Sequence, residues 1–265
     1  MTIHFHKYEG TGNDFIIIDN RTHWFDKNNH KLIAKLCNRK FGIGADGLML
    51  LEDCPGFDLR MIYFNADGKE SSMCGNGGRC IVAFANVLGI IPHTAQFIAI
   101  DGTHEAMICD KDDKNTATLV RLKMNNIVDI ENTDNYAYLN TGSPHYVKIV
   151  ENVEMLNVFN EGRKIRYNER FAKEGTNVDF IEKREQGIFV RTYERGVEDE
   201  TLSCGTGVVA SALTASLTGI IHSDFCKIQT RGGNLTVYFD RVGESFKNIW
   251  LEGPAKFVFK GEIVM

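Results

Sequence analysis

Residues Cys74-Gly75-Asn76-Gly77-Gly78-Arg79-Cys80 open an apolar run that continues from Ile81 to Leu88. The glycines and the apolar run predict a turn that leads into a buried helix. The first N–H groups of a helix have no carbonyl partner within the helix and lie at the positive end of its dipole. Such a terminus can bind a carboxylate, and it stabilises a thiolate, so the pKa of a cysteine there should fall. The stretch therefore offers a base, Cys74, beside a binding site for an acid group.

The chain repeats this pattern. Cys204-Gly205-Thr206-Gly207 opens a second apolar segment, and residues 74–91 and 204–221 have the same length and both end in Gly-Ile-Ile. In each copy a strand-like segment precedes the cysteine, and two strand-like segments separated by glycine follow the helix. A repeat of this length indicates two halves with the same fold.

Two apolar helices, each flanked by many short strand-like segments, predict an α+β (mixed α/β) fold with two pseudo-symmetric domains. In each domain a sheet or barrel should wrap around a central helix, because a helix that is apolar on all sides must be buried. We expect an N-terminal domain at residues 1–116, to which residues 255–265 return, and a C-terminal domain at residues 117–254. The polar stretch 110–115 should be the linker or hairpin between them.

Composition and charge exclude several classes of protein. A hydrophobic content of 43% and a charged content of 25% are typical of a globular protein, and a net charge of −5 without a basic cluster argues against a nucleic-acid partner. Seven cysteines without a CxxC pair predict neither a disulfide scaffold nor a metal site. The N-terminus lacks a signal-peptide pattern, and no apolar run is long enough to cross a membrane. We therefore expect a reduced, cytoplasmic protein.

The two cysteines suggest a reaction. A pseudo-twofold arrangement would place Cys74 and Cys204 at an active site in the interdomain cleft. One sulfur could then take a proton from one face of a carbon while the other delivers a proton to the opposite face, which inverts that carbon. The helix N-termini would stabilise a substrate carboxylate as negative charge develops beside it. No pattern typical of a pyridoxal phosphate site is present in the sequence, so we expect no cofactor.

Over essentially its whole length the sequence resembles diaminopimelate epimerases. The resemblance rests on a set of motifs that are specific in combination: Gly12-Asn13-Asp14-Phe15, Phe64-Asn65-Ala66-Asp67-Gly68, Cys74-Gly75-Asn76-Gly77, Pro144-His145, Thr176-Asn177, Glu194-Arg195-Gly196 and Cys204-Gly205-Thr206-Gly207. It implies a homodimer that converts the amino acid LL-2,6-diaminopimelate into its meso form, a precursor of lysine and the cell wall, without a cofactor. It also implies two pseudo-symmetric domains around a cleft.

The resemblance implies a role for each matching residue. Cys74 and Cys204 would be the catalytic pair, and His145 and Glu194 would tune them. Backbone amides would hold the carboxylate at the reacting centre, from Gly75, Asn76, Gly205 and Thr206. The distal amino-acid end of the substrate would be bound by Asn13, Asn65, Asn177 and Arg195, with Glu194 among the substrate contacts.

Two residues depart from the family pattern. Gly47 stands where some members have Gln, and Ser143 stands where many have Asn. Both positions concern possible substrate contacts, so a racemase of another amino acid on the same fold is the alternative. A thiol redox protein that uses the Cys74 and Cys204 pair is a second alternative, which the anion-binding glycine turns disfavour. Related folds carry isomerases and dehydratases with other nucleophiles, and the presence of both cysteines argues against those activities.

Overall fold

The computed structural model describes residues 1–111 and 116–265, which form two compact units. The first unit consists of residues 1–122 and 253–265, and the second of residues 123–252. Of the predicted linker, Asp110 and Lys111 end a strand, and residues 112–115 lie outside the described residues. The domain limits expected from the sequence stay a prediction.

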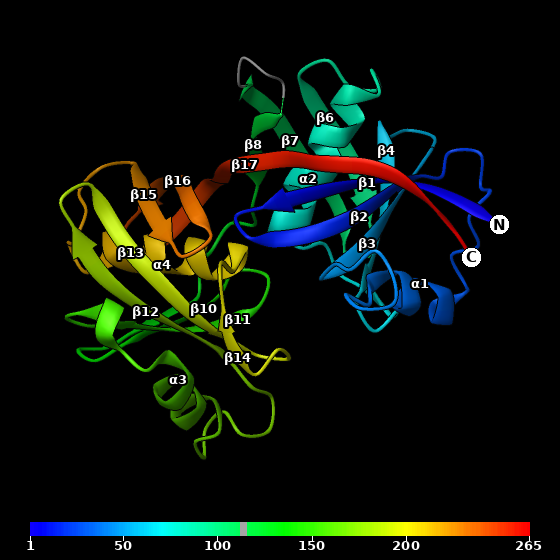
Figure 1. Cartoon of the computed structure of the whole chain (residues 1–265). Coiled ribbons are helices and arrows are strands. Elements are labelled where there is room, and N and C mark those ends of the chain that lie inside the picture. Colours follow the sequence, from blue (N-terminus) through cyan, green and yellow to red (C-terminus); the bar gives the residue numbers. More distant parts are fainter. Residues whose placement is uncertain (112–115) are drawn as a thin grey trace. The chain divides into compact units, whose positions relative to one another are not determined.

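The first unit consists of short strands and two helices (Figure 1). Its elements are β1 (Thr2–Gly10), β2 (Asn13–Asp19), α1 (His30–Cys37), β3 (Gly47–Glu52), β4 (Leu59–Asn65), β5 (Glu70–Ser71), α2 (Gly75–Val87), β6 (Thr94–Ala99), β7 (Gly102–Lys111), β8 (Ala117–Lys123) and the second half of β17 (Ser245–Val264).

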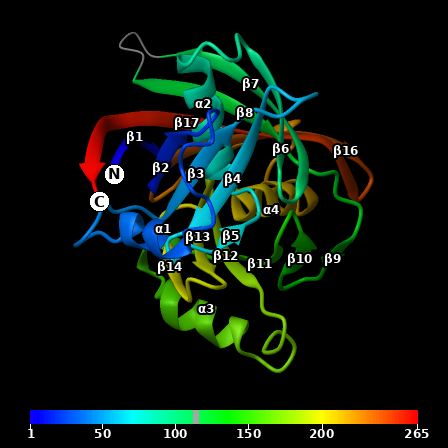
Figure 2. The same cartoon turned by 90° about the vertical axis from the view of Figure 1, so that its right-hand side faces the viewer.

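These strands close into a barrel around α2. Neighbouring strands pair in the order β8-β7-β6-β4-β3-β2-β1-β17, and β17 pairs again with β8. Helix α2 packs against β1, β2, β3, β4 and β7, and α1 packs outside against β3 (Figure 2). Gly77 allows the close approach of α2, because a Cβ there would lie 3.2 Å from Sδ of Met49. The prediction of a sheet wrapped around a central helix is confirmed for this unit.

The second unit is built from the same kinds of element. These are β9 (Ile130–Asn132), β10 (Ala137–Asn140), β11 (Pro144–Ile149), the 3-10 helix η1 (Val153–Met155), α3 (Val158–Arg166), β12 (Asn177–Arg184), β13 (Gly187–Glu194), β14 (Asp199–Thr201), α4 (Gly205–Leu217), β15 (Phe225–Thr230), β16 (Gly233–Val242) and the first half of β17.

The strand order of the second unit repeats that of the first. Both units run antiparallel, parallel, antiparallel, parallel, antiparallel and antiparallel, from β1 to β8 and from β10 to β17. Helices α2 and α4 are both 13 residues long and occupy the same place in this order. Two like-folded halves, as the sequence repeat predicts, are thus confirmed.

The interior of the second unit explains why α4 is apolar on all sides. Helix α4 packs against β10, β11, β12, β13, β15 and β16, and almost every residue from Gly205 to Ser216 is buried. Val208, Val209 and Leu213 are completely buried in this core. Within the described part of the chain, no helix is long and apolar enough to cross a membrane.

Candidate active site

Helix α2 begins directly after Cys74. This cysteine is the N-cap residue, with extended backbone angles (φ −92°, ψ 132°), and its carbonyl oxygen accepts a 2.7 Å hydrogen bond from the N–H of Gly78. No acidic side chain occupies the first turn, and the cysteine side chain is half-buried. The prediction that the Cys74 thiol lies at a helix N-terminus is therefore confirmed.

Asn13 lies beside this thiol. Its Oδ1 is 3.6 Å from Sγ of Cys74 and 3.5 Å from Nδ2 of Asn76. The amide nitrogen of Asn13 donates a 2.6 Å hydrogen bond to Oδ2 of Asp46, which also pairs with Arg39. Because Asp46 accepts from the NH2 group, the carbonyl oxygen of Asn13 is the atom that faces the sulfur. Asp46 is thus an orienting residue, and it is not among the residues predicted from the sequence.

Arg79 is completely buried next to the helix start. Its Nη1 donates to the carbonyl oxygen of Gly75 at 3.1 Å, and its Nη2 donates to Oδ1 of Asn76 at 2.9 Å. Burial lowers the pKa of this guanidinium from its usual value. The sequence contains a signal for this residue, since a charged side chain interrupts an otherwise apolar helix.

Gly47 and Asn65 are opposite one another in β3 and β4. A Cβ at residue 47 would lie 2.4 Å from Cε2 of Tyr63 and 2.6 Å from the carbonyl oxygen of Phe64, so this position has no room for a side chain. Any contact that Gly47 makes with a substrate must come from its backbone. Asn65 is exposed at the end of β4.

Helix α4 begins after Cys204 with the same geometry. The cysteine backbone is extended (φ −115°, ψ 115°), and its carbonyl oxygen accepts a 2.9 Å hydrogen bond from the N–H of Val208. Sγ of Cys204 lies 3.4 Å from Oγ1 of Thr206, and the cysteine is only 8% exposed. The hydroxyl of Thr141 donates to the Thr206 carbonyl oxygen at 2.8 Å, which fixes the first turn.

The expectation of a lowered pKa at Cys204 is wrong. Burial raises the pKa of this thiol well above its usual value, and the nearby carboxylates of Glu194 and Asp179 raise it further. Hydrogen bonds from Thr206 and from the backbone of Gly207 act in the opposite direction but do not prevail. The free-energy cost of removing the thiolate from water is larger here than the stabilisation that the helix N-terminus provides.

His145 connects this helix start to a buried carboxylate. Its Nε2 is 2.8 Å from Oγ1 of Thr206 and its Nδ1 is 2.7 Å from Oδ2 of Asp179, and both His145 and Asp179 are completely buried. The hydroxyl of Thr192 donates to the other oxygen of Asp179 at 2.6 Å. Asp179 is not among the residues predicted from the sequence, although a charged residue within the apolar strand from Val178 to Ile181 is a signal of a buried polar contact.

Asn177 contacts His145 and connects it to two further predicted residues, Ser143 and Arg195. Nδ2 of Asn177 lies 3.2 Å from Nε2 of His145 and 3.0 Å from Oγ of Ser143. The backbone N–H of Arg195 donates to Oδ1 of Asn177 at 2.8 Å, and its guanidinium approaches Ser143 at 3.4 Å. Glu194, the residue before Arg195, acts electrostatically on Cys204.

These contacts connect most of the predicted residues into two groups, one in each unit, and do not include Gly47 and Asn65. The first unit brings Cys74, Gly75 and Asn76 next to Asn13. The second unit brings together His145, Asn177, Glu194, Arg195, Ser143, Cys204, Gly205 and Thr206. Their roles toward a substrate stay predictions.

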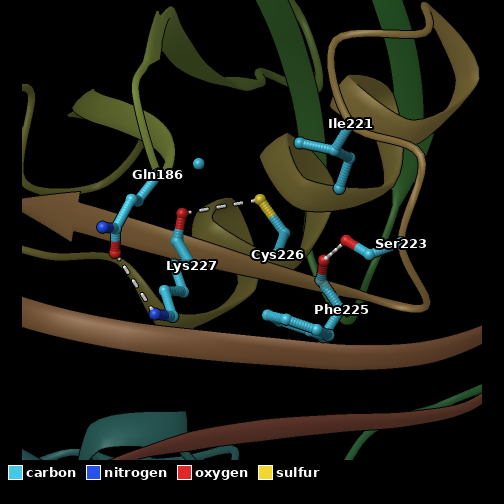
Figure 3. A pocket seen from close by; sticks show the side chains of 7 residues that line it. Gln186, Ile221, Ser223, Phe225, Cys226 and Lys227 are labelled. Carbon is cyan, nitrogen blue, oxygen red and sulfur yellow. Dashed lines mark hydrogen bonds between the residues drawn. The ribbon is translucent and has the colours of Figure 1, made fainter.

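A cavity of about 280 Å³ lies elsewhere in the second unit. Figure 3 shows it beside β15, where Ile221, Phe225 and Cys226 give it a largely apolar wall and Lys227 donates to Gln186 at 3.4 Å. None of the predicted site residues lines it. Burial raises the pKa of the Cys226 thiol to about 12, so this cysteine is a packed apolar residue rather than a base.

Among residues 1–111 and 116–265, no group of three or more His, Cys, Asp or Glu side chains could hold a metal ion.

The two like units, each built around a central helix, have a fold that solved structures share. A phenazine biosynthesis protein of the PhzF family from Bacillus anthracis superposes with a TM-score of 0.75 at 16% identity, over 100% of both chains. A hydroxyproline epimerase from Agrobacterium vitis superposes with a TM-score of 0.67 at 15% identity, over 99% of this chain and 92% of the other.

Sequence comparison then identifies the family among proteins with this fold. The family model for diaminopimelate epimerase matches residues 5–126 and 137–258. The chain is 51% identical to a diaminopimelate epimerase of Flavobacterium psychrophilum, over 97% of this chain and 99% of the relative. It is 42% identical to that of Chlorobaculum tepidum, with the same coverage. The chain belongs to the diaminopimelate epimerase family, which confirms the resemblance drawn from the motifs.

Proposed function

We propose that this chain is an isomerase that converts LL-2,6-diaminopimelate into meso-2,6-diaminopimelate. One observation carries the proposal: each unit begins its central helix with a cysteine, in a chain that is 51% identical to a diaminopimelate epimerase. The product would serve the synthesis of lysine and of cell-wall precursors.

The reaction requires one base and one acid on opposite faces of the α-carbon. A thiolate removes the α-proton, and the thiol of the other cysteine delivers a proton to the opposite face. Backbone amides at the two helix starts, from Gly75, Asn76, Gly205 and Thr206, would bind the α-carboxylate and stabilise the charge that develops beside it. The pair therefore works as one thiolate and one thiol, and the two roles exchange when the reaction runs in reverse.

The contacts within each unit suggest how the substrate is held. Because Oδ1 of Asn13 is 3.6 Å from the Cys74 sulfur, we assign Asn13 to the reacting end of the substrate, as an acceptor for the α-ammonium group, rather than to the distal end. Asn65, Asn177 and Arg195 keep the role of binding the distal amino-acid end. Glu194 and His145 would adjust the protonation of Cys204.

The finer parts of the proposal follow the family resemblance. We propose a cytoplasmic homodimer that acts without a cofactor, since two thiols supply both the acid and the base. Activity that persists after dialysis against EDTA and after treatment with hydroxylamine would support this. Recovery of lost activity by added metal or pyridoxal phosphate would contradict it.

A racemase of another amino acid is the second candidate. It is favoured by Gly47, where the backbone of Phe64 and the ring of Tyr63 leave no room for a side chain, and by Ser143. A thiol redox function is disfavoured, because a reactive redox cysteine has a low pKa and good exposure, whereas Cys204 has neither.

The test is an assay of α-proton exchange in D2O against a panel of amino acids that includes LL-diaminopimelate. The expected result is the meso isomer with one deuterium, seen by chiral chromatography and mass spectrometry, and little exchange in the other amino acids. Faster exchange in another amino acid than in diaminopimelate would favour the racemase.

A further inference from the structure

A continuous line of hydrogen bonds runs from Cys204 to Asp179. Sγ of Cys204 is 3.4 Å from Oγ1 of Thr206, Oγ1 is 2.8 Å from Nε2 of His145, and Nδ1 of His145 is 2.7 Å from Oδ2 of Asp179. All four residues belong to the second unit. His145 and Asp179 are completely buried, so this end of the line is shielded from water.

The direction of each hydrogen bond follows from Asn177. The backbone N–H of Arg195 donates to Oδ1 of Asn177, so the other end of this amide is its NH2 group, which lies 3.2 Å from Nε2 of His145. A donor at that distance requires an unprotonated Nε2. His145 therefore carries its proton on Nδ1 and donates it to Asp179.

The rest of the line is then determined. Nε2 of His145 also accepts a hydrogen bond from the Thr206 hydroxyl. Because Thr206 has a single hydroxyl proton, its oxygen must accept from the Cys204 thiol. In the resting state the Cys204 thiol donates to Oγ1 of Thr206, and the Thr206 hydroxyl donates to Nε2 of His145. Nδ1–H of His145 donates to the carboxylate of Asp179.

We propose that this line is a proton relay for Cys204, in which the Thr206 hydroxyl passes the proton to His145 and Asp179 is the positioning residue that sets the histidine tautomer. The inference rests on the proposed epimerase function. As the S–H bond breaks, the proton binds Oγ1, and the original hydroxyl proton of Thr206 moves to Nε2. The products are a Cys204 thiolate and an imidazolium at His145, and the carboxylate of Asp179 keeps its charge beside that imidazolium.

The surroundings of Cys204 explain why it needs such a route. The thiol is buried, and the two carboxylates that face it, Glu194 and Asp179, oppose a negative charge on sulfur. Transfer of the proton to His145 creates a positive charge between Asp179 and the sulfur, which compensates both negative groups. The helix N-terminus alone does not achieve this, since the pKa of Cys204 is raised.

The first unit has different residues at the matching strand positions. Within the repeated strand pairs, His145 pairs with Asn177 as Phe15 pairs with Gly47, and Val147 pairs with Asp179 as Ile17 pairs with Met49. Phenylalanine and methionine thus stand where the second unit has histidine and aspartate. At these paired positions of the described residues, the histidine and the aspartate of the relay are specific to the second unit.

Gly207 allows the carboxylate of Asp179 to lie close to the start of α4. A Cβ at residue 207 would lie 2.4 Å from Oδ1 of Asp179 and 3.2 Å from Cε1 of His145. The second glycine of Cys204-Gly205-Thr206-Gly207 is therefore the residue that lets Asp179 and His145 reach the first turn of α4.

The first experiment compares Thr206→Val with its matched control Thr206→Ser. Valine keeps the shape of the side chain but removes the hydroxyl, whereas serine keeps the hydroxyl. We expect Thr206→Val to lower kcat about 100-fold with KM changed less than about threefold, and Thr206→Ser to stay within about fivefold of wild type. Equal kcat for the two variants, both folded by circular dichroism, would overturn the relay.

The second experiment measures the tautomer of His145 directly, on enzyme labelled with nitrogen-15 histidine and without substrate. We expect a neutral ring with its proton on Nδ1 in wild type, and a proton on Nε2 in Asp179→Asn together with a loss of kcat of at least about 100-fold, because an asparagine amide can donate to Nδ1. A wild-type ring protonated on Nε2 would refute the assignment. The Thr206 pair carries the test if Asp179→Asn does not fold.

The spectrum also separates the two proposals. Wild-type enzyme with the Nδ1 tautomer but no activity on diaminopimelate would refute the proposed function and leave the hydrogen-bond order intact. Active enzyme in which Thr206→Val has normal kcat would refute the relay alone.

Discussion

Nη2 of Arg79 lies 2.9 Å from Oδ1 of Asn76, and both side chains are buried at the start of α2. The fifth residue after the cysteine is thus a guanidinium in the first unit, where the second unit has Val209. Arg79 interacts electrostatically with Cys74, whereas the charges that act on Cys204 are carboxylates. The two cysteines occupy like positions in like folds, but a guanidinium acts on Cys74 and two carboxylates act on Cys204.

Replacement of Arg79 by Met should reduce activity more than stability. A buried charge replaced by an apolar side chain of similar size often has little net effect on folding, so we expect the free energy of unfolding to change by no more than about 2 kcal/mol. Oδ1 of Asn76 loses one of its donors, and Cys74 loses a nearby positive charge, so kcat/KM should fall at least about 10-fold.

The control for this variant is Arg79→Lys, which keeps the charge but cannot reach both Gly75 and Asn76 in the same way. Its activity should lie between those of wild type and Arg79→Met. Denaturant unfolding and initial rates measure the two quantities, and a Met variant with wild-type kcat/KM would show that Arg79 is structural only.

Replacement of either cysteine by Ala should abolish inversion. Neither half of a two-base reaction completes the inversion alone, so Cys74→Ala and Cys204→Ala should each lose at least about 1,000-fold in rate. Cys226→Ala is the matched control, because this buried cysteine of the same unit as Cys204 lies at the cavity of Figure 3, and its activity should be near that of wild type.

With wild-type enzyme in D2O, early product should contain deuterium at the α-carbon while remaining substrate stays protiated. Mass spectrometry of both isomers at low conversion measures this. Early product that retains the substrate hydrogen would point to a single shuttling base and contradict the assignment of the two cysteines.

Gly207→Ala should destabilise the protein through Asp179. The added Cβ would meet Oδ1 of Asp179 at 2.4 Å, so we expect a loss of about 1–3 kcal/mol in the free energy of unfolding. In an Asp179→Ala background this clash is absent, and Ala is a better helix former than Gly by about 1 kcal/mol. The cost of Gly207→Ala should therefore shrink or change sign there, and equal costs in the two backgrounds would show that the residues are not coupled.

Asp14→Asn should destabilise the protein in a pH-dependent way. Burial alone would raise the pKa of Asp14, but hydrogen bonds and charges from Arg39 and Lys7 hold it well below its usual value. A lowered folded-state pKa means that the carboxylate stabilises the fold at neutral pH, and that this contribution shrinks once pH falls below about 4, where the unfolded chain takes up the proton.

We expect Asp14→Asn to cost on the order of 2 kcal/mol at pH 7, less than for a fully buried pair because the Asp14 side chain is 20% exposed, and less at pH 3. Denaturant unfolding of wild type and variant at both pH values provides the measurement. A difference that is the same at pH 3 and pH 7 would contradict the assigned ion pairs.

Local patterns in the sequence were sufficient to predict the architecture and a cysteine at the start of each central helix. The repeat of Cys-Gly-x-Gly before an apolar segment predicts two like units with central helices, because helix burial and helix termini depend on neighbouring residues. Both helices begin directly after these cysteines, at Gly75 and Gly205.

The environment of Cys204 was decided only by the tertiary structure. His145, Asp179 and Thr206 come from β11, β12 and α4, and their contact depends on the register of two parallel strands and on the packing of a helix, which no local pattern specifies. Burial of the Cys204 thiol and the carboxylates of Glu194 and Asp179 raise its pKa, whereas the helix terminus alone predicts a lowered pKa. The helix dipole is a property of consecutive residues, whereas desolvation and charge depend on every chain segment that packs against the thiol.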